Sequence, residues 1–198
     1  MKTQAAATAA KPYHHGDLRR ALLDAALTII ERDGPEGLSL RAVAREAGVS
    51  PAAPYHHFKD KSDLLGAVAE DGFRRLKVAM NKSGAELGAG GAGVAYVRFS
   101  HQNPALYRIM YDCARSFENM PGGQEDDGFK LLKDKIRKAS GGGLAEIDVE
   151  LAAIASWCAA HGLAEISTFR QFQPLKDALG GEDAFVRAVL DHLGMFKH

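Results

Sequence analysis

Apolar residues recur every three or four positions along most of this chain, which is the spacing of amphipathic helices. The first such run begins at Asp17, continues through Ile29 and Ile30, and stops at Gly34-Pro35. Sustained alternation of apolar and polar residues is missing, and no Asn-Gly or Asp-Gly hairpin joins β-branched runs, so strands are not predicted. The pattern predicts an all-α fold of about nine helices.

Helix start and stop signals divide the first third of the chain into four helices. Ser39 is placed to cap a second helix, which Gly48 would end in the left-handed conformation. Ser50 is placed to cap a third helix. Asp60, with Asp63 three residues later, resembles a capping box for a fourth.

The remaining two thirds contain helical runs separated by glycine-rich stretches. Residues 84–93 (GAELGAGGAG) form the clearest break, and the stretches at 120–128 and 140–143 predict further loops. The expected helices are 94–102, 104–117, 129–139, 147–172 and 182–196.

Composition adds limits rather than a function. The 198 residues are 46% hydrophobic and 25% charged with no net charge, as in an ordinary globular protein. Two cysteines, Cys113 and Cys158, are too few for a disulfide framework and fit reduced thiols. Neither a signal peptide nor an apolar run of the ~20 residues that span a bilayer is visible, so we expect a cytoplasmic protein without a membrane contact.

The short second and third helices, joined by a tight Gly-containing turn, have the pattern of a helix-turn-helix. Such a motif places its second helix in the major groove of DNA. Small residues at Ala52 and Ala53 would let the backbone approach the bases. Nearby side chains can donate hydrogen bonds to phosphates or base edges, namely Tyr55, His56, His57, Lys59 and Lys61.

The run LLDAALTIIERDGPEGLSLRAVAREAGVSPAAPYHHFKDKSDLLGAV, within residues 17–68, resembles the DNA-binding domain of TetR-type transcriptional repressors. The shared features are A-x-x-I-I-E-x-x-G, Ser-Leu-x-x-V-A, the turn A-G-V-S, Tyr-x-x-Phe and a following Lys. The segment from Trp157 to Gly162 also resembles the Trp-His-Gly signature of one subclass of TetR-like ligand domains.

The resemblance implies a homodimer that binds a palindromic operator in double-stranded DNA and is released by an unknown small-molecule effector. It implies an N-terminal arm over 1–14, a DNA-binding domain over 15–62, and a ligand-binding and dimerisation domain over 63–198. The implied DNA-contacting residues are Ser39, Arg41, Ser50, Ala52, Ala53, Tyr55, His56, His57, Lys59 and Lys61. Two interpretations of the N-terminal arm are left open. Its basic residues reach the DNA backbone, or the arm is merely solvated; these residues are Lys11, His14, His15 and Arg19.

Pro54 departs from the family pattern, which has an aliphatic residue at this place. In a helix beginning at Pro51, residue 54 would donate to the carbonyl of Ser50, and proline lacks the N–H. We therefore expect a distorted first turn in the third helix.

Aromatic residues mark a candidate effector site in the second region. Trp157 and His161 are four apart and share a helix face. Either these side chains line a ligand pocket, or they belong to an ordinary core in which the histidine is hydrogen-bonded to a backbone carbonyl. The same two interpretations apply to the apolar and hydroxylated side chains of the preceding helices, so the full set is Tyr96, Phe99, Tyr107, Met110, Tyr111, Phe117, Trp157 and His161.

Residues 151–164 are apolar almost all round, which indicates burial on more than one side. The last helix carries the stripe Phe185, Val186, Val189, Leu190 and Leu193. We therefore expect the last two helices to form a four-helix dimer interface.

Two rival functions remain at this stage. One is a helical enzyme that uses His161 with Glu165, although no nucleophile, phosphate-loop or metal motif supports it, and we expect neither an enzyme, a metal nor a cofactor. The other is a TetR-like fold that acts only through protein partners because Pro54 spoils the DNA helix. Whether binding represses or activates transcription is left open by the sequence.

Overall fold

The computed structural model describes residues 15–87, 90–116 and 128–193, and in these ranges all regular structure is helical. It contains nine α-helices and three short 3-10 helices, which confirms the predicted all-α class. The chain separates into two compact units, Met1–Leu64 and Leu65–His198, which are described one at a time.

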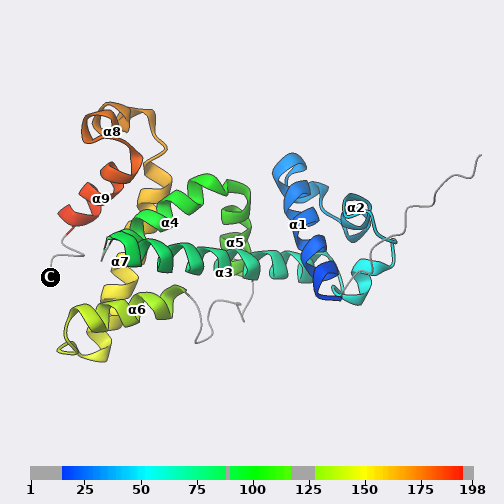
Figure 1. Cartoon of the computed structure of the whole chain (residues 1–198), viewed down its shortest axis with the longest axis horizontal. Helices are drawn as coiled ribbons and strands as arrows, with labels where there is room; N and C mark the ends of the chain where they lie inside the picture. Colours follow the sequence, from blue (N-terminus) through cyan, green and yellow to red (C-terminus); the bar gives the residue numbers. More distant parts are fainter. Residues whose placement is uncertain (1–14, 88–89, 117–127, 194–198) are drawn as a thin grey trace, which may run out of the picture. The chain divides into compact units, whose positions relative to one another are not determined.

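The first unit is a small helical bundle around one apolar core. α1 (His15–Asp33) packs on α2 (Leu40–Glu46), with the 3-10 helix η1 (Pro35–Gly37) between them (Figure 1). Val43 of α2 and Phe58 from the loop before α3 are among its buried side chains. Leu40 is buried as well, and Val49 is half-buried.

The signals predicted at Ser39, Gly48 and Asp60 form as expected. The Ser39 hydroxyl accepts the backbone N–H of Ala42 at 3.1 Å, and Gly48 has φ +67°, a left-handed conformation that suits glycine. Asp60 accepts the N–H of Asp63 at 2.9 Å, while Asp63 accepts the N–H of Lys59 at 2.9 Å. These two carboxylates start α3 (Lys61–Leu87).

The second unit contains most of α3 and six further helices (Figure 1). They are α4 (Gly91–Gln102), α5 (Pro104–Ser116), α6 (Gly128–Ala139), α7 (Glu146–Ile166), α8 (Gln173–Leu179) and α9 (Glu182–His192). α4 is buried along almost its whole length and packs against α5, α7 and α9. A Cβ at Gly93 would lie 2.5 Å from Leu190 Cδ1, so glycine at this position permits the close approach of α9.

Two predicted boundaries in this unit are wrong. The glycine-rich stretch 84–93 is not one break, because α3 continues to Leu87 and α4 already begins at Gly91. Helix packing outweighs the modest intrinsic cost of glycine in a helix, about 1 kcal/mol per residue. The loop predicted at 120–128 lies outside the described residues up to position 127.

The helix predicted over 147–172 ends at Ile166, and a new helix, α8, follows the 3-10 helix η3 (Arg170–Phe172). Lys176 of α8 donates a hydrogen bond to the carbonyl of Ser167 at 2.5 Å, which folds the chain back at the end of α7. The predicted helices 104–117 and 182–196 are present as α5 and α9, with residues 117 and 194–196 outside the described ranges.

α7 is the most apolar helix of the described chain. By length and composition alone it is long and apolar enough to cross a membrane, and a third of its apolar window is buried in the fold (33%). The expectation that no apolar run reaches this length is corrected here. Core helices of globular proteins pass the same test, and α7 contacts α4, α6 and α9 within the unit. α6 is fastened to it by two ion pairs, Lys133–Glu150 at 2.6 Å and Arg137–Glu146 at 2.5 Å.

Candidate functional site

The segment after Gly48 carries a short 3-10 helix, η2 (Ala53–His56), where an α-helix capped by Ser50 was predicted. Its hydrogen bonds span three residues: Ala53 N–H donates to the Ser50 carbonyl at 3.0 Å, and Tyr55 N–H to the Ala52 carbonyl at 3.2 Å. No side-chain cap precedes η2, so the capping role predicted for Ser50 is wrong. The predicted distortion is confirmed, because residue 54 has no N–H for an α-helical bond.

η2 has a buried side and an exposed side. Pro54 is buried and precedes the buried ring of Phe58, on which the Arg19 guanidinium lies 5.6 Å from the ring centre. Tyr55 is 54% exposed, and His56 is exposed as well. The single turn therefore anchors itself on proline and turns a phenol and an imidazole to the surface.

The sequence-predicted DNA-contacting residues fall on this surface and beside it. Exposed positions are Ser39, Arg41, Ser50, Ala52, Tyr55, His56 and Lys59, and half-buried positions are Ala53, His57 and Lys61. None is buried, so all ten are accessible to some degree. Their role in DNA binding stays a prediction. Lys11 and His14 lie outside the described residues, as does the side chain of His15.

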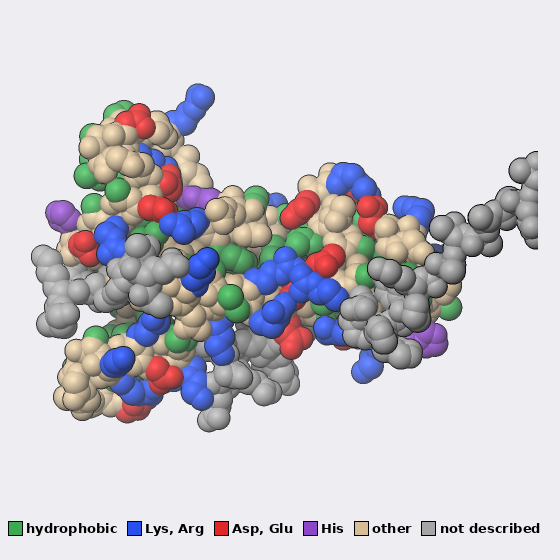
Figure 2. All heavy atoms as spheres, viewed as in Figure 1, with side chains coloured by type: hydrophobic (Ala, Val, Ile, Leu, Met, Phe, Trp, Pro, Cys, Tyr) green, Lys and Arg blue, Asp and Glu red, His purple; other side chains and the backbone are tan. Residues whose placement is uncertain are grey.

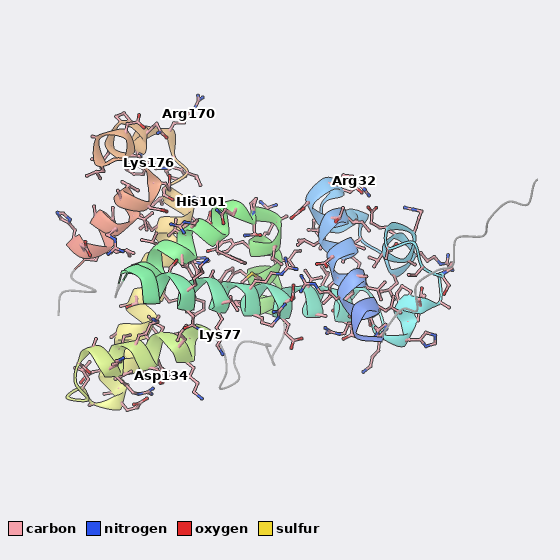
Figure 3. All side chains as sticks on the ribbon, in the orientation of Figure 1. Arg32, Lys77, His101, Asp134, Arg170 and Lys176 are labelled. Carbon is pink, nitrogen blue, oxygen red and sulfur yellow. The ribbon has the colours of Figure 1, made fainter. Side chains whose placement is uncertain are left out.

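The cations of the first unit divide into two groups. Arg20 pairs with Asp24 at 3.0 Å within α1, and Arg32 of α1 (labelled in Figure 3) pairs with Glu46 of α2 at 3.2 Å, so these two arginines are neutralised by carboxylates of the unit. Within the described ranges, Arg41, Lys59 and Lys61 have no carboxylate partner at ion-pair distance. Figure 2 shows basic and acidic side chains interspersed over the visible face, in keeping with zero net charge.

The second unit contains a cluster of rings with converging polar atoms, which we call the tyrosine cluster: Tyr96, Tyr107, Tyr111, Trp157 and His161. The Tyr96 hydroxyl lies 2.6 Å from that of Tyr111 and 3.2 Å from that of Tyr107. Trp157 Nε1–H donates to the Tyr96 hydroxyl at 3.3 Å. His161 Nδ1 lies 3.0 Å from the Tyr96 hydroxyl and 2.7 Å from that of Tyr107.

The Tyr96 hydroxyl is the centre of this network and has more neighbours than hydrogen-bonding positions. It has four neighbours at hydrogen-bond distance, whereas a phenol has one donor and two acceptor positions. An arrangement that respects these limits has Trp157 and Tyr111 donating to Tyr96 and Tyr107 donating to His161 Nδ1. The Tyr96 hydroxyl then donates to the Tyr107 oxygen, because Tyr107 already occupies the one lone pair of His161 Nδ1. The other tautomer of His161, in which Nδ1 carries the proton and donates, permits a second arrangement, so the centre of the cluster can rearrange.

Burial fixes the protonation of the cluster. It raises the pKa values of Tyr96, Tyr107 and Tyr111 well above their ordinary value, because the ring environment disfavours a phenolate. The hydroxyl–hydroxyl contacts change this only in part. All three tyrosines are therefore neutral hydrogen-bond donors at physiological pH.

The cluster contains five of the eight residues predicted for an effector site, namely Tyr96, Tyr107, Tyr111, Trp157 and His161. Phe99 is buried without a described contact to the network, and Met110 packs on α3, where a Cβ at Gly72 would lie 2.7 Å from its Cγ. Phe117 lies outside the described residues. A ligand role for the set stays a prediction.

Two rings at the border of the cluster were not predicted from the sequence. Phe73 of α3 lies edge-on to Tyr111 at 5.7 Å, and Phe129 of α6 lies 5.9 Å from Trp157. Helical spacing places each within its own helix face, but nothing in the sequence pairs a face of α3 with a residue of α5.

A second polar group was not predicted either. His101 Nε2 donates to the carbonyl of Ala164 at 2.8 Å, and its Nδ1 lies 3.7 Å from Glu182. Lys176, which Figure 3 labels, donates to Glu182 at 2.5 Å and is almost fully buried. This group ties α4, α8 and α9 to the C-terminal end of α7. We interpret it as a structural clasp.

Comparison with known proteins adds to these observations. Residues 22–68 match the family model of bacterial regulatory proteins of the tetR family. Residues 91–193 match the tetracyclin repressor-like C-terminal domain, so the two models cover the two units in turn.

Solved structures show the same arrangement of elements over almost the full chain. A protein of unknown function from Rhodococcus sp. RHA1 is 31% identical over 94% of this chain and 97% of its own, with a TM-score of 0.72. A putative transcriptional regulator from Pseudomonas aeruginosa PAO1 is 26% identical, covering 91% and 92%, with a TM-score of 0.61. A tetR-family regulatory protein from Rhodococcus RHA1 is 20% identical over 90% and 95%, with a TM-score of 0.64, and shares the fold.

Helix-turn-helix caps, an outward-facing polar turn and a separate helical unit are thus accompanied by family matches in both halves. The chain belongs to the TetR family of bacterial transcriptional regulators.

Proposed function

We propose that this regulator is a homodimeric repressor that binds a palindromic DNA operator and is released by a small molecule. In this proposal residues 15–62 bind DNA, whereas 63–198 dimerise and bind the effector. The observation that carries it is η2, which turns Tyr55 and His56 to the surface while Pro54 and Phe58 anchor it from below.

η2 enters the major groove of DNA, as the second element of a helix-turn-helix does. The exposed small side chain of Ala52 leaves the backbone close to the base edges. Lys61 at the start of α3 holds one phosphate through its ammonium charge, whereas the N–H of Asp63 at the same helix start is already bonded to Asp60. Arg41 at the start of α2 holds another.

Dimerisation uses α7 first, and α9 less than the sequence indicated. Phe185, Val186 and Leu190 of α9 are buried inside the subunit, so they are not available to a partner. α7 instead exposes large apolar side chains on successive turns, at Ile147, Leu151 and Ile154, which are 64%, 58% and 46% exposed. Exposed apolar surface that recurs along one face of a helix is typical of a subunit interface.

The effector binds at the tyrosine cluster and acts on DNA through α3. Tyr111 contacts Phe73 of α3 at 5.7 Å, and α3 continues without interruption to Lys61. A molecule that replaces the shared hydrogen bonds of Tyr96 would move Tyr111 and shift α3. The two recognition turns of a dimer must lie about 34–36 Å apart to enter successive major grooves, so a shifted α3 favours a conformation that binds DNA less well.

A gel shift on the region upstream of the protein's own gene, at 50 mM and 200 mM salt, tests the proposal. We expect binding that weakens by about 10³-fold or more, because phosphate contacts by a dimer dominate affinity. Salt-independent binding or no binding to any palindrome would contradict it. A Lys61→Ala, Tyr55→Ala variant that dimerises but binds no DNA separates this function from one exerted only through protein partners.

A further inference from the structure

We infer that Pro54 is a specificity-determining positioning residue: it sets the 3-10 turn and thereby decides which base pairs Tyr55 and His56 read. The inference rests on the proposed DNA-binding function and deepens it. Pro54 itself is buried and touches no base in this proposal.

The turn is held mainly by bonds that span three residues, whereas those of an α-helix span four. Ala53 N–H donates to the carbonyl of Ser50 at 3.0 Å, three residues back, and this occupies the acceptor that residue 54 would use in an α-helix. At the other end, the Pro54 carbonyl accepts from both His57 and Phe58 at 2.9 Å. Pro54 thus removes the competing α-helical bond and also closes the turn onto the buried Phe58.

The two helix types place side chains differently. An α-helix turns about 100° and rises about 1.5 Å per residue, whereas a 3-10 helix turns about 120° and rises about 2.0 Å. Over the three steps from Ala53 to His56 the difference is about 60° and about 1.5 Å. A side-chain tip about 5–6 Å from the helix axis moves by a similar distance, which exceeds the ~3.4 Å between stacked bases.

In the 3-10 geometry residues three apart align, so the small Ala52 lies on the same ridge as Tyr55, and both are exposed. This face of the 3-10 helix therefore carries the small side chain of Ala52 next to the long side chain of Tyr55. His56 stands on the neighbouring ridge and is also exposed. Tyr55 and His56 consequently face adjacent base pairs, with one hydrogen-bonding group for each.

The experiment is selection of binding sites from a random duplex library by the full-length protein and its Pro54→Ala variant. Alanine restores the N–H that can donate to Ser50, so the turn can become α-helical. We expect Pro54→Ala to prefer a different base at one or two adjacent positions of each half-site. The ratio of the new base to the wild-type base at those positions should rise by at least tenfold. The salt dependence of its binding should equal that of the wild type, because phosphate contacts are untouched.

Pro51→Ala is the matched control, since Pro51 is exposed, stands before η2 and blocks no bond of the turn. It should select the wild-type sequence. Circular dichroism and thermal unfolding show whether Pro54→Ala is folded. Tyr55→Phe and His56→Asn keep the turn, and each should relax the preference at one base pair, the two base pairs being adjacent.

A folded Pro54→Ala variant that selects the wild-type sequence would overturn the inference. So would unchanged selection by both Tyr55→Phe and His56→Asn, whatever the folding of the proline variant, because Pro54 would then have nothing to position. If the wild-type protein itself selects no sequence, both the proposed DNA-binding function and the inference about Pro54 fail. If the wild type selects a sequence and the variants do not change it, only the inference about Pro54 fails.

Discussion

The recognition turn and the tyrosine cluster use similar side chains in opposite ways. η2 presents a tyrosine and a histidine to solvent, with their polar atoms open to a partner. The tyrosine cluster encloses three tyrosines and a histidine that hydrogen-bond to one another. Residue type therefore does not determine the role of a phenol; the surrounding packing does.

The difference also concerns what each site requires of its fold. The turn needs a rigid base under an exposed face, which Pro54 and Phe58 supply. The cluster needs a centre that can exchange partners, which the four neighbours of the Tyr96 hydroxyl supply. The first arrangement suits a rigid surface such as duplex DNA, and the second suits a site that changes when occupied.

The largest expected effect comes from the base of the turn. Phe58→Ala should lower the free energy of unfolding of the first unit by about 3–5 kcal/mol, because Phe58 is 2% exposed and its truncation leaves a cavity. Tyr55→Ala, three positions earlier and exposed, should change it by about 0.5 kcal/mol or less. Chemical denaturation followed by circular dichroism measures both. Equal destabilisation by the two variants would contradict the contrast between the buried Phe58, which follows the turn, and the exposed Tyr55 on it.

Removing the central hydroxyl of the cluster should have the next largest effect. Tyr96→Phe removes the acceptor of the Trp157 N–H and of the Tyr111 hydroxyl. Trp157 is 42% exposed, so its N–H can bond to water, and we expect a loss of about 1 kcal/mol in the second unit. Trp157 is the only tryptophan, so its emission reports the change directly. Tyr55→Phe is the control and should change neither the stability of the second unit nor the Trp157 emission. An unchanged emission spectrum and unchanged stability would show that the network is not formed.

High pH should weaken the second unit through the same tyrosines. Their folded-state pKa values are raised above the ordinary value of 10.0, so the unfolded chain loses these protons first. Their contribution to stability is therefore complete below pH 10 and is lost as pH rises through the folded pKa values. Absorbance at 295 nm should show three of the five tyrosines ionising late, together with unfolding. Five tyrosines titrating together near pH 10 would contradict burial of the cluster.

The smallest effect is on phosphate binding. Lys61→Ala should weaken DNA binding only several-fold, because in the proposed complex Lys61 contacts a phosphate and no base. It should also reduce the slope of log affinity against log salt by about 0.9 for each phosphate that the protein no longer neutralises, and in a dimer the substitution affects two phosphates. Anisotropy titrations at four salt concentrations give the slope. An unchanged slope would remove Lys61 from the interface.

Sequence reasoning predicted the first unit more completely than the second, for physical reasons. Ser39, Asp60 and Asp63 bond to backbone groups a few residues away, and Gly48 acts through its own left-handed conformation. Such local effects can be predicted from neighbouring residues in the sequence. Pro54 predicted a distorted first turn in the third helix, and the turn is distorted. The 3-10 helix that replaces the expected α-helix was not predicted, because the sequence does not say how the turn closes.

The second unit depends on contacts between distant segments. Tyr96 and His161 were both predicted at one site, but the pairing of Phe73 with Tyr111 and of Phe129 with Trp157 follows from helix packing alone. The end of α7 at Ile166 likewise depends on Lys176, ten residues later, reaching back to Ser167. Periodicity continues across that point, so the predicted helix ran to residue 172, whereas α7 ends at Ile166 and η3 follows.

Hydrogen exchange on the full-length protein, with and without its selected DNA duplex, tests the central claim most directly. The account predicts slower exchange of the amides around residues 50–61 when DNA is bound, with little change in the helices that carry Tyr96, Tyr107 and His161. Protection confined to those helices, or exchange at 50–61 that DNA leaves unchanged, would contradict it.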